Sequence, residues 1–197
     1  NLYLKKKEAE YESKNIQTNN IIKSATNDQL EIIYLLLSKK DKIEKFMFRD
    51  CKLNRISIPS TIEVIGKFAF DGSKISEISL PTSVTVINEF AFRDCISLIK
   101  ISIPSSVKTF CDFAFRNCTS LEKVTFGISS CLESIGKFVF DGCKSLKKII
   151  IPSSVKKIHD YVFRSCESLV EIYFEIPSSL DSIGIFAFDS CLNLKQI

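Results

Sequence analysis

The sequence contains no tryptophan, one methionine and one histidine among its 197 residues. A single imidazole leaves little basis for catalysis or zinc binding, which usually require several coordinated side chains. The six glycines are scattered, so no glycine-rich loop is present that could cradle a phosphate. No apolar run approaches the ~20 residues of a membrane-spanning helix. No apolar stretch follows the first lysines as it would in a signal peptide. We therefore expect no membrane span and no cofactor.

The charge of the chain is nearly balanced. There are 27 basic and 23 acidic residues, which give a formal net charge of +4. A nucleic-acid-binding protein usually carries a strong basic excess on one face. The sequence therefore predicts no nucleic-acid partner. Separately, its length is sufficient to form a hydrophobic core.

The dominant feature of the sequence is an internal repeat. An aromatic pair, Phe-x-Phe with Tyr once in first place, recurs seven times at intervals of 22 to 25 residues. The second members of the pairs are Phe48, Phe70, Phe92, Phe115, Phe140, Phe163 and Phe188. Each unit begins with the alternating pattern Leu-x-x-Ile-x-Ile, which is typical of a short, half-buried strand. A proline then ends the strand in most units.

The second half of the unit reads Val-x-x-Ile-Gly-x-Phe-Ala-Phe-x-x-Cys in its clearest form. This half is too short for a full helix, and we expect one or two turns of helix or 3₁₀-helix. A unit of this size cannot bury its apolar side alone, so the units must stack with their strands parallel. Two units are longer by two residues and place Phe126 and Phe174 in the slot that Ile103 occupies elsewhere.

This unit resembles the BspA-like class of leucine-rich repeat proteins, because strand, proline, Ile-Gly, Ala-Phe and cysteine occur in that order. The resemblance implies an α/β solenoid, with a parallel β-sheet on the concave side and short helical or 3₁₀ turns on the convex side. It covers residues 43–197 as seven units. It also implies binding rather than catalysis, often as a surface antigen or adhesin. The chain departs from the pattern at Ser73, which stands in the cysteine slot.

Residues 1–42 lie outside the repeat, and we interpret them as an amino-terminal arm and a helical cap. Thr26 and Gln29 have the spacing of a capping box, and the apolar run Leu30–Leu37 follows. The alternative for residues 27–38 is a degenerate first strand, with Tyr34 and Leu36 in the two isoleucine slots. At the other end an eighth strand begins at Leu194. We therefore expect a truncated array whose open end favours self-association.

Six of the eight cysteines occupy one repeat slot, three residues after the second Phe. They are Cys51, Cys95, Cys118, Cys143, Cys166 and Cys191. The alternatives are metal ligands, disulfides or a ladder of buried thiols. No Cys-x-x-Cys pair is present, and stacked repeats point equivalent side chains in the same direction. We favour the thiol ladder and predict no metal site.

Arginine and aspartate alternate in the slot after the second Phe, from Arg49 and Asp71 to Asp189. We interpret them as exposed ion pairs between neighbouring repeats, worth ~0–1 kcal/mol each. His159 stands in the slot of Gly66 and Asn88, which favours a turn residue over a general base, since asparagine and histidine tolerate left-handed backbone. We therefore expect no catalytic residues and no enzymatic activity.

The side chains that point outward from the strands remain as the candidate site. Strand alternation places them on the concave face, where mixed charges and an aromatic ring favour contact with a protein ligand. The candidate binding residues are Lys100, Ser102, Lys123, Thr125, Lys148, Ile150, Glu171 and Tyr173. The family resemblance favours a cell-surface or secreted binding module. The alternative is an intracellular scaffold of the same fold, which unpaired cysteines favour.

Overall fold

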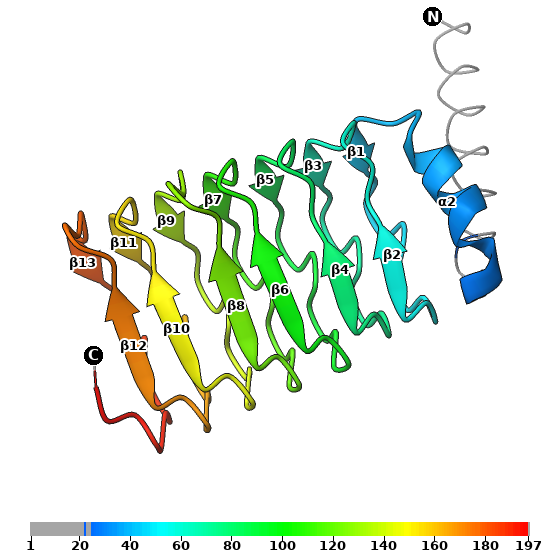
Figure 1. Cartoon of the computed structure of the whole chain (residues 1–197). Helices are drawn as coiled ribbons and strands as arrows, with labels where there is room; N and C mark the ends of the chain where they lie inside the picture. The colour runs from blue at the N-terminus through cyan, green and yellow to red at the C-terminus, as the bar shows by residue number, and fades with distance from the viewer. Residues whose placement is uncertain (1–21, 23–24, 197) are drawn as a thin grey trace, which may run out of the picture.

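The computed structural model describes residues 22 and 25–196. Residues 1–42 were predicted as an arm and helical cap, and the first 24 of them lie outside the described residues apart from Ile22. Figure 1 shows a coil of repeats stacked along one axis, with two rows of parallel strands on opposite sides. We call these rows the front sheet and the back sheet.

The front sheet has six strands, one from each Leu-x-x-Ile-x-Ile segment, in the spatial order β12-β10-β8-β6-β4-β2. These strands are β2 (Arg55–Ser57), β4 (Glu77–Ser79), β6 (Lys100–Ile103), β8 (Lys123–Phe126), β10 (Lys148–Ile151) and β12 (Glu171–Phe174). Exposed and buried residues alternate in β2, β4, β6 and β10, as in half-buried strands, whereas β8 and β12 each end in two partly buried residues. The predicted parallel solenoid of stacked repeats is therefore confirmed.

The second half of each unit differs from the expectation in one respect. It contains a two-residue strand followed by turns, and no helix occurs between residues 38 and 196. The short strands form the seven-stranded parallel back sheet. They are β1 (Lys42–Ile43), β3 (Val64–Ile65), β5 (Val86–Ile87), β7 (Thr109–Phe110), β9 (Ser134–Ile135), β11 (Lys157–Ile158) and β13 (Ser182–Ile183). Pairing with the neighbouring repeat satisfies backbone groups that a single helical turn would leave unpaired.

The turns after each back strand form a third link between repeats. Their backbone N–H groups alternate between a carbonyl three residues back and a carbonyl of the next repeat. Phe48 donates to the oxygen of Ala69 at 2.7 Å, and Arg49 donates to the oxygen of Phe46 at 3.1 Å. The first aromatic residue of each pair has a left-handed backbone, with φ of 62° at Phe46 and 57° at Phe68. His159 and Gly66 do not, so the predicted reason for their shared slot was wrong.

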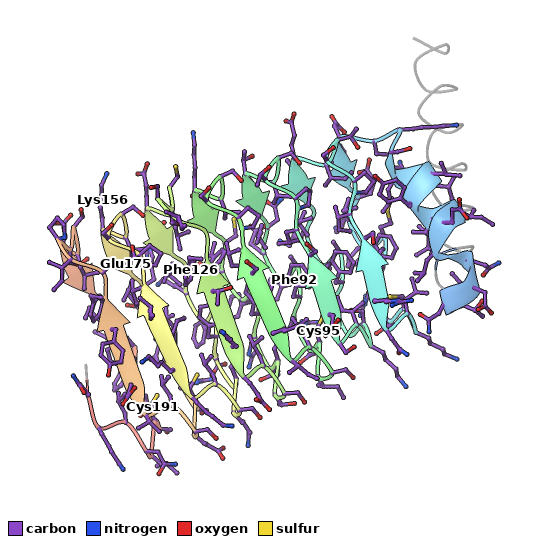
Figure 2. The ribbon with its side chains drawn as sticks, in the orientation of Figure 1. Phe92, Cys95, Phe126, Lys156, Glu175 and Cys191 are labelled. Atoms are coloured by element: carbon purple, nitrogen blue, oxygen red, sulfur yellow. The ribbon has the colours of Figure 1, made fainter. Side chains whose placement is uncertain are left out.

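The second aromatic residues form the centre of the core. Phe92 is fully buried between the sheets, and its ring stacks on Phe70 and Phe115 with centroids 5.0 Å apart (Figure 2). The first aromatic residues form a separate, half-buried stack. Arg93 covers that stack, with its guanidinium 5.3 Å from the rings of both Phe68 and Phe90. One aromatic ladder is therefore core, whereas the other is a surface layer that cations shield from water.

The amino-terminal end of the stack carries the helix rather than the alternative strand. A 3₁₀ turn, η1 (Asn27–Gln29), leads into α2 (Leu30–Leu37), and the capping box of Thr26 and Gln29 is present. Ile33 and Leu37 are buried against the core, while Leu35 is 57% exposed. Figure 1 shows α2 lying across the end of the coil beside β2. One face of the helix therefore covers apolar side chains of the first repeat.

The alternating charges are more buried than the sequence suggested. The carboxylates of Asp71 and Asp141 are only 2% and 3% exposed, so the interpretation as exposed pairs was wrong for them. Arg93 donates to Asp71 through Nε at 2.7 Å and through Nη2 at 2.9 Å, and Arg49 adds a third contact at 3.2 Å. Asp141 lies likewise between Arg116 and Arg164. Arginine stems on the neighbouring rings remove these carboxylates from water.

The cysteine slot is a buried ladder of free thiols, and all eight cysteines are unpaired. From Cys95 onward, each of the five ladder thiols donates to the carbonyl of the second Phe in the preceding repeat. Cys118 reaches the oxygen of Phe92 at 3.1 Å, and the backbone N–H of Cys95 donates to the same oxygen. Burial raises the pKa of Cys51 and Cys191 to about 11. Cysteine thus supplies a weak donor in an otherwise apolar slot.

Candidate functional site

The outward side chains of the front sheet form two rows that run across the strands. Lys100 pairs in register with Glu77 on one side and Lys123 on the other, and Lys148 pairs with Glu171. The second row places Ser102 beside Thr125 and Ile150 beside Tyr173. Parallel pairing at ~4.8 Å per strand brings all eight predicted residues onto one continuous surface. The structure therefore gathers them on one face.

The face is hollowed at its centre. A depression of about 400 Å³ extends from β2 to β8, and its polar lining includes Arg55, Glu77, Ser102 and Thr125. It continues into a second depression of about 470 Å³ between β8 and β10. Lys123 and Thr125 line both, so the two depressions adjoin. We call the second one the β8–β10 cleft.

The β8–β10 cleft lies where the front sheet parts. All four residues of β10 pair with β12, and all four of β8 pair with β6. Between β8 and β10, in contrast, only Lys123 and Lys148 are in register. This is the step at which a longer repeat is followed by a shorter one. The two extra residues after Phe126 lead β8 away from its neighbour, and the front sheet opens at that point.

Sequence reasoning identified part of this cleft and missed the rest. Lys123, Thr125, Lys148 and Ile150 line it as candidate residues, but so do Glu122, Val124, Phe126, Lys147 and Glu175. Phe126 stands in the slot of the buried Ile103, yet its ring is only partly buried at the end of β8 (Figure 2). Glu175 follows β12, and its carboxylate accepts from the Ser153 backbone at 3.1 Å. The two-residue insertions that follow Phe126 and Phe174 were the feature of the sequence that could have indicated the positions of Phe126 and Glu175.

On the front strands from β4 to β12, every charged side chain except Lys123 makes an ion pair. Lys100 contacts Glu77 at 3.2 Å, and Lys148 contacts Glu171 at 3.4 Å. The ammonium of Lys148 also lies 4.2 Å from the centroid of the Tyr173 ring. Lys123 stands between the two lysines and makes no ion pair within the described part of the chain. The centre of the face therefore presents one cation available to a ligand.

The structure assembles no recognisable catalytic group around the single histidine. His159 follows β11 on the back of the stack, and its backbone N–H donates to the oxygen of Ile135 at 3.0 Å. Among the described residues no cluster of three potential metal ligands occurs. No helix in that same part of the chain is long and apolar enough to cross a membrane.

A coil of short parallel strands with aromatic and cysteine ladders defines a β-solenoid of the leucine-rich repeat class. The sequence matches the BspA type Leucine rich repeat region in six copies, over residues 41–170 and 125–197. The chain belongs to this family, whose fold is generally non-catalytic and is used for protein interaction. No curated protein sequence is a significant match to the chain.

Solved bacterial structures share the fold. A leucine-rich repeat protein of T. pallidum is 33% identical, with a TM-score of 0.71 over 78% of this chain and 71% of that one. A leucine rich cell surface protein of Faecalibacterium prausnitzii is 29% identical, with a TM-score of 0.56 over 81% of this chain and 51% of that one. The pneumococcal vaccine antigen PcpA is 22% identical, with a TM-score of 0.53 over 74% of this chain and 51% of that one. The chain spans about half the length of the last two.

Proposed function

We propose that the chain is a non-catalytic module that binds a protein ligand on the outward face of its front sheet. The observation that carries the proposal is the hollowed face itself. Its two adjoining depressions are lined by Lys100, Ser102, Lys123, Thr125, Lys148 and Ile150, with Glu171 and Tyr173 beside them. Mixed charge, one unpaired lysine and an exposed aromatic ring are features that protein interfaces use. A further hollow of about 720 Å³ beside back strand β1 is lined by polar side chains such as Lys39, Lys42 and Glu44 and by no aromatic residue.

The experiment is a comparative capture of partners from an extract of the source organism. The intact chain is compared with a Lys148→Glu, Tyr173→Ala double variant and with the matched control Lys157→Glu. Lys157 is exposed on back strand β11 and makes no ion pair in the described residues. We expect proteins captured by the intact chain and the control to be depleted at least fivefold on the double variant. Equal capture by all three would contradict the proposal.

We infer a cell-surface or secreted location for this module. The F. prausnitzii structure supports it, because that protein is described as a cell surface protein. The alternative is an intracellular scaffold, and one observation favours it. All eight cysteines are free, which suits a reducing compartment. Protease treatment of intact cells separates the two, since only a surface protein is degraded while the membrane remains closed.

We also propose that this chain self-associates through a second copy at its carboxyl-terminal end. Ile185 and Phe186 are 64% and 60% exposed there, and β13 is an edge strand. Uncovered apolar area beside an open strand edge favours pairing of chains. Weak association is detected at micromolar concentrations, so sedimentation velocity is run from about 1 µM to about 100 µM protein. The average mass of the sedimenting species should rise with protein concentration. The Ile185→Lys variant should remain monomeric, and a monomer for both would contradict the proposal.

A further inference from the structure

The β8–β10 cleft combines an apolar wall with a cation that has no partner. Phe126 and Ile150 line one part of it, and Ile150 is 47% exposed on an otherwise polar row. Lys123 lies at the other part, where β8 and β10 are still in register. The remaining charges are engaged, because Lys147 contacts Glu122 at 3.9 Å and Glu175 accepts from Ser153. The cleft therefore offers one anionic and one apolar contact side by side.

The position of Lys123 makes an anionic occupant favourable. Its neighbours in register, Lys100 and Lys148, are also cations, but each has a glutamate partner. Three ammonium groups on adjacent strands repel one another, and the central one has no carboxylate to offset that repulsion. A carboxylate placed beside Lys123 would complete the alternation of charge along the row.

Two projecting isoleucines extend the apolar surface at the same edge. Ile128 and Ile176 occupy the two-residue insertions that follow β8 and β12, and they are 94% and 93% exposed. Glu175, the neighbour of Ile176, lines the cleft (Figure 2). Large apolar side chains that are almost fully exposed at the tips of loops contribute nothing to the core. They can bury area only against another molecule.

We propose that the β8–β10 cleft anchors a partner protein through an aspartate or glutamate next to a large apolar side chain. The carboxylate pairs with Lys123, and the apolar side chain packs against Phe126 and Ile150. A polypeptide suits the cleft better than a sugar chain, because the apolar wall of Phe126 and Ile150 cannot satisfy buried hydroxyl groups. This proposal rests on the proposed function and names the anchoring point on the same face.

The test is selection from a phage-displayed library of random 12-residue peptides on the immobilised chain. We expect the selected peptides to share an acidic residue adjacent to Phe, Leu, Ile or Trp. Synthetic copies should bind Lys123→Glu and Ile150→Glu at least tenfold more weakly than the intact chain. They should bind Arg55→Glu and Lys157→Glu within twofold, since these charge reversals lie elsewhere on the front sheet and on the back sheet. Thermal melting of each variant confirms that it is folded, and Lys123→Gln repeats the test with a smaller change.

The other outcomes separate this proposal from the broader one. Peptides that lose affinity on Arg55→Glu but not on Lys123→Glu would overturn the cleft as the anchor, while front-face binding would stand. Peptides indifferent to all three front-face variants would contradict both proposals. Failure to enrich an acidic–apolar pair overturns the proposed occupant. Binding of heparin that depends on Lys123, without selection of such peptides, overturns it in favour of a polyanionic sugar chain.

Discussion

The burial of two aspartate side chains requires explanation, because removing a carboxylate from water is costly. Asp71 is 2% exposed and receives hydrogen bonds from Arg93 while Arg49 lies on its other side. A carboxylate removed from water is tolerated because it is paired by charged donors in a fixed geometry. The arginines are partly exposed, so each ion pair contributes less to the free energy of unfolding than a fully buried pair would. These triads link three successive repeats on the side of the aromatic stack.

Replacing Asp71 with Asn should therefore destabilise the fold by about 1–3 kcal/mol, because two guanidinium groups lose their carboxylate partner. Chemical denaturation followed by circular dichroism measures the change. The control is Asp189→Asn, which occupies the same repeat slot but is exposed and makes no ion pair within the described residues. Its effect should stay within about 0.5 kcal/mol. Equal losses of stability in both variants would show that burial of the Asp71 carboxylate does not determine its contribution.

The thiol ladder makes a prediction about chemical reactivity. Burial raises the pKa of Cys143 and Cys166 well above the usual value for a thiol, so little thiolate forms near neutral pH. Cys131 is exposed. In the native protein at pH 8 iodoacetamide should modify Cys131 at least tenfold faster than the ladder cysteines, as mass spectrometry of tryptic peptides would show. In non-reducing denaturant all eight should react; four or fewer would indicate disulfides.

The same raised pKa values predict how stability depends on pH. Below pH 9, the ordinary thiol range, the cysteines are protonated in both the folded and the unfolded chain. Above it, the unfolded chain loses thiol protons while the folded chain keeps them, so unfolding is favoured. The free energy of unfolding should fall from pH 8 to pH 10.5. The free energy of unfolding of the Cys143→Ala variant should fall less steeply with pH. An identical slope for the variant and the intact chain would show that the thiol ladder does not cause the pH dependence.

At the scale of elements, helix α2 packs on the end of the stack beside β2. Its buried side chain Leu37 should be important for stability, whereas Leu35 on the same helix is 57% exposed. We expect Leu37→Ala to cost about 2–5 kcal/mol and Leu35→Ala less than about 1 kcal/mol. Urea denaturation measures both. Comparable losses would mean that the helix does not cover the end of the core.

The elements that the sequence predicted well are those that repeat without interruption. Alternation in segments such as Lys100–Ile103 marks the strand and its outward side chains, and the stack follows from recurrence of the unit. The back strands were missed because two residues, as in Val64–Ile65, are too few to display a period. The left-handed backbone of Phe46 was missed because bulky residues rarely adopt it. Its ring gains a stacked neighbour, Phe68, at 5.1 Å.

The sequence was enough to predict which residues lie on the candidate face, but not that the face contains a cleft. Strand alternation was enough to place Lys123 and Ile150 outward. The cleft itself depends on how a longer repeat meets a shorter one, which is a property of two adjacent units rather than of one pattern. Phe126 could be assigned to a slot from sequence, but its partial exposure arises from the parting of β8 and β10.

For the whole molecule, the repeats have unequal roles although they share one pattern. The ladders of Phe, Cys and Ile on the inside hold the stack together through contacts between neighbours. The front face varies from strand to strand, and under the proposed function that variation provides specificity without disturbing the core. Substitutions on this face should therefore change binding with little change in stability, in contrast to Asp71 or Leu37.

The most direct test of front-face binding is photo-crosslinking from single positions. A photoreactive phenylalanine is introduced at Ser102 or Thr125 on the front sheet, or at the exposed Thr109 on the back sheet. All three variants are expressed in the source organism and illuminated. The account predicts covalent adducts to a shared protein partner from Ser102 and Thr125 and none from Thr109. Adducts from Thr109 alone, or equally from both sheets, would contradict it.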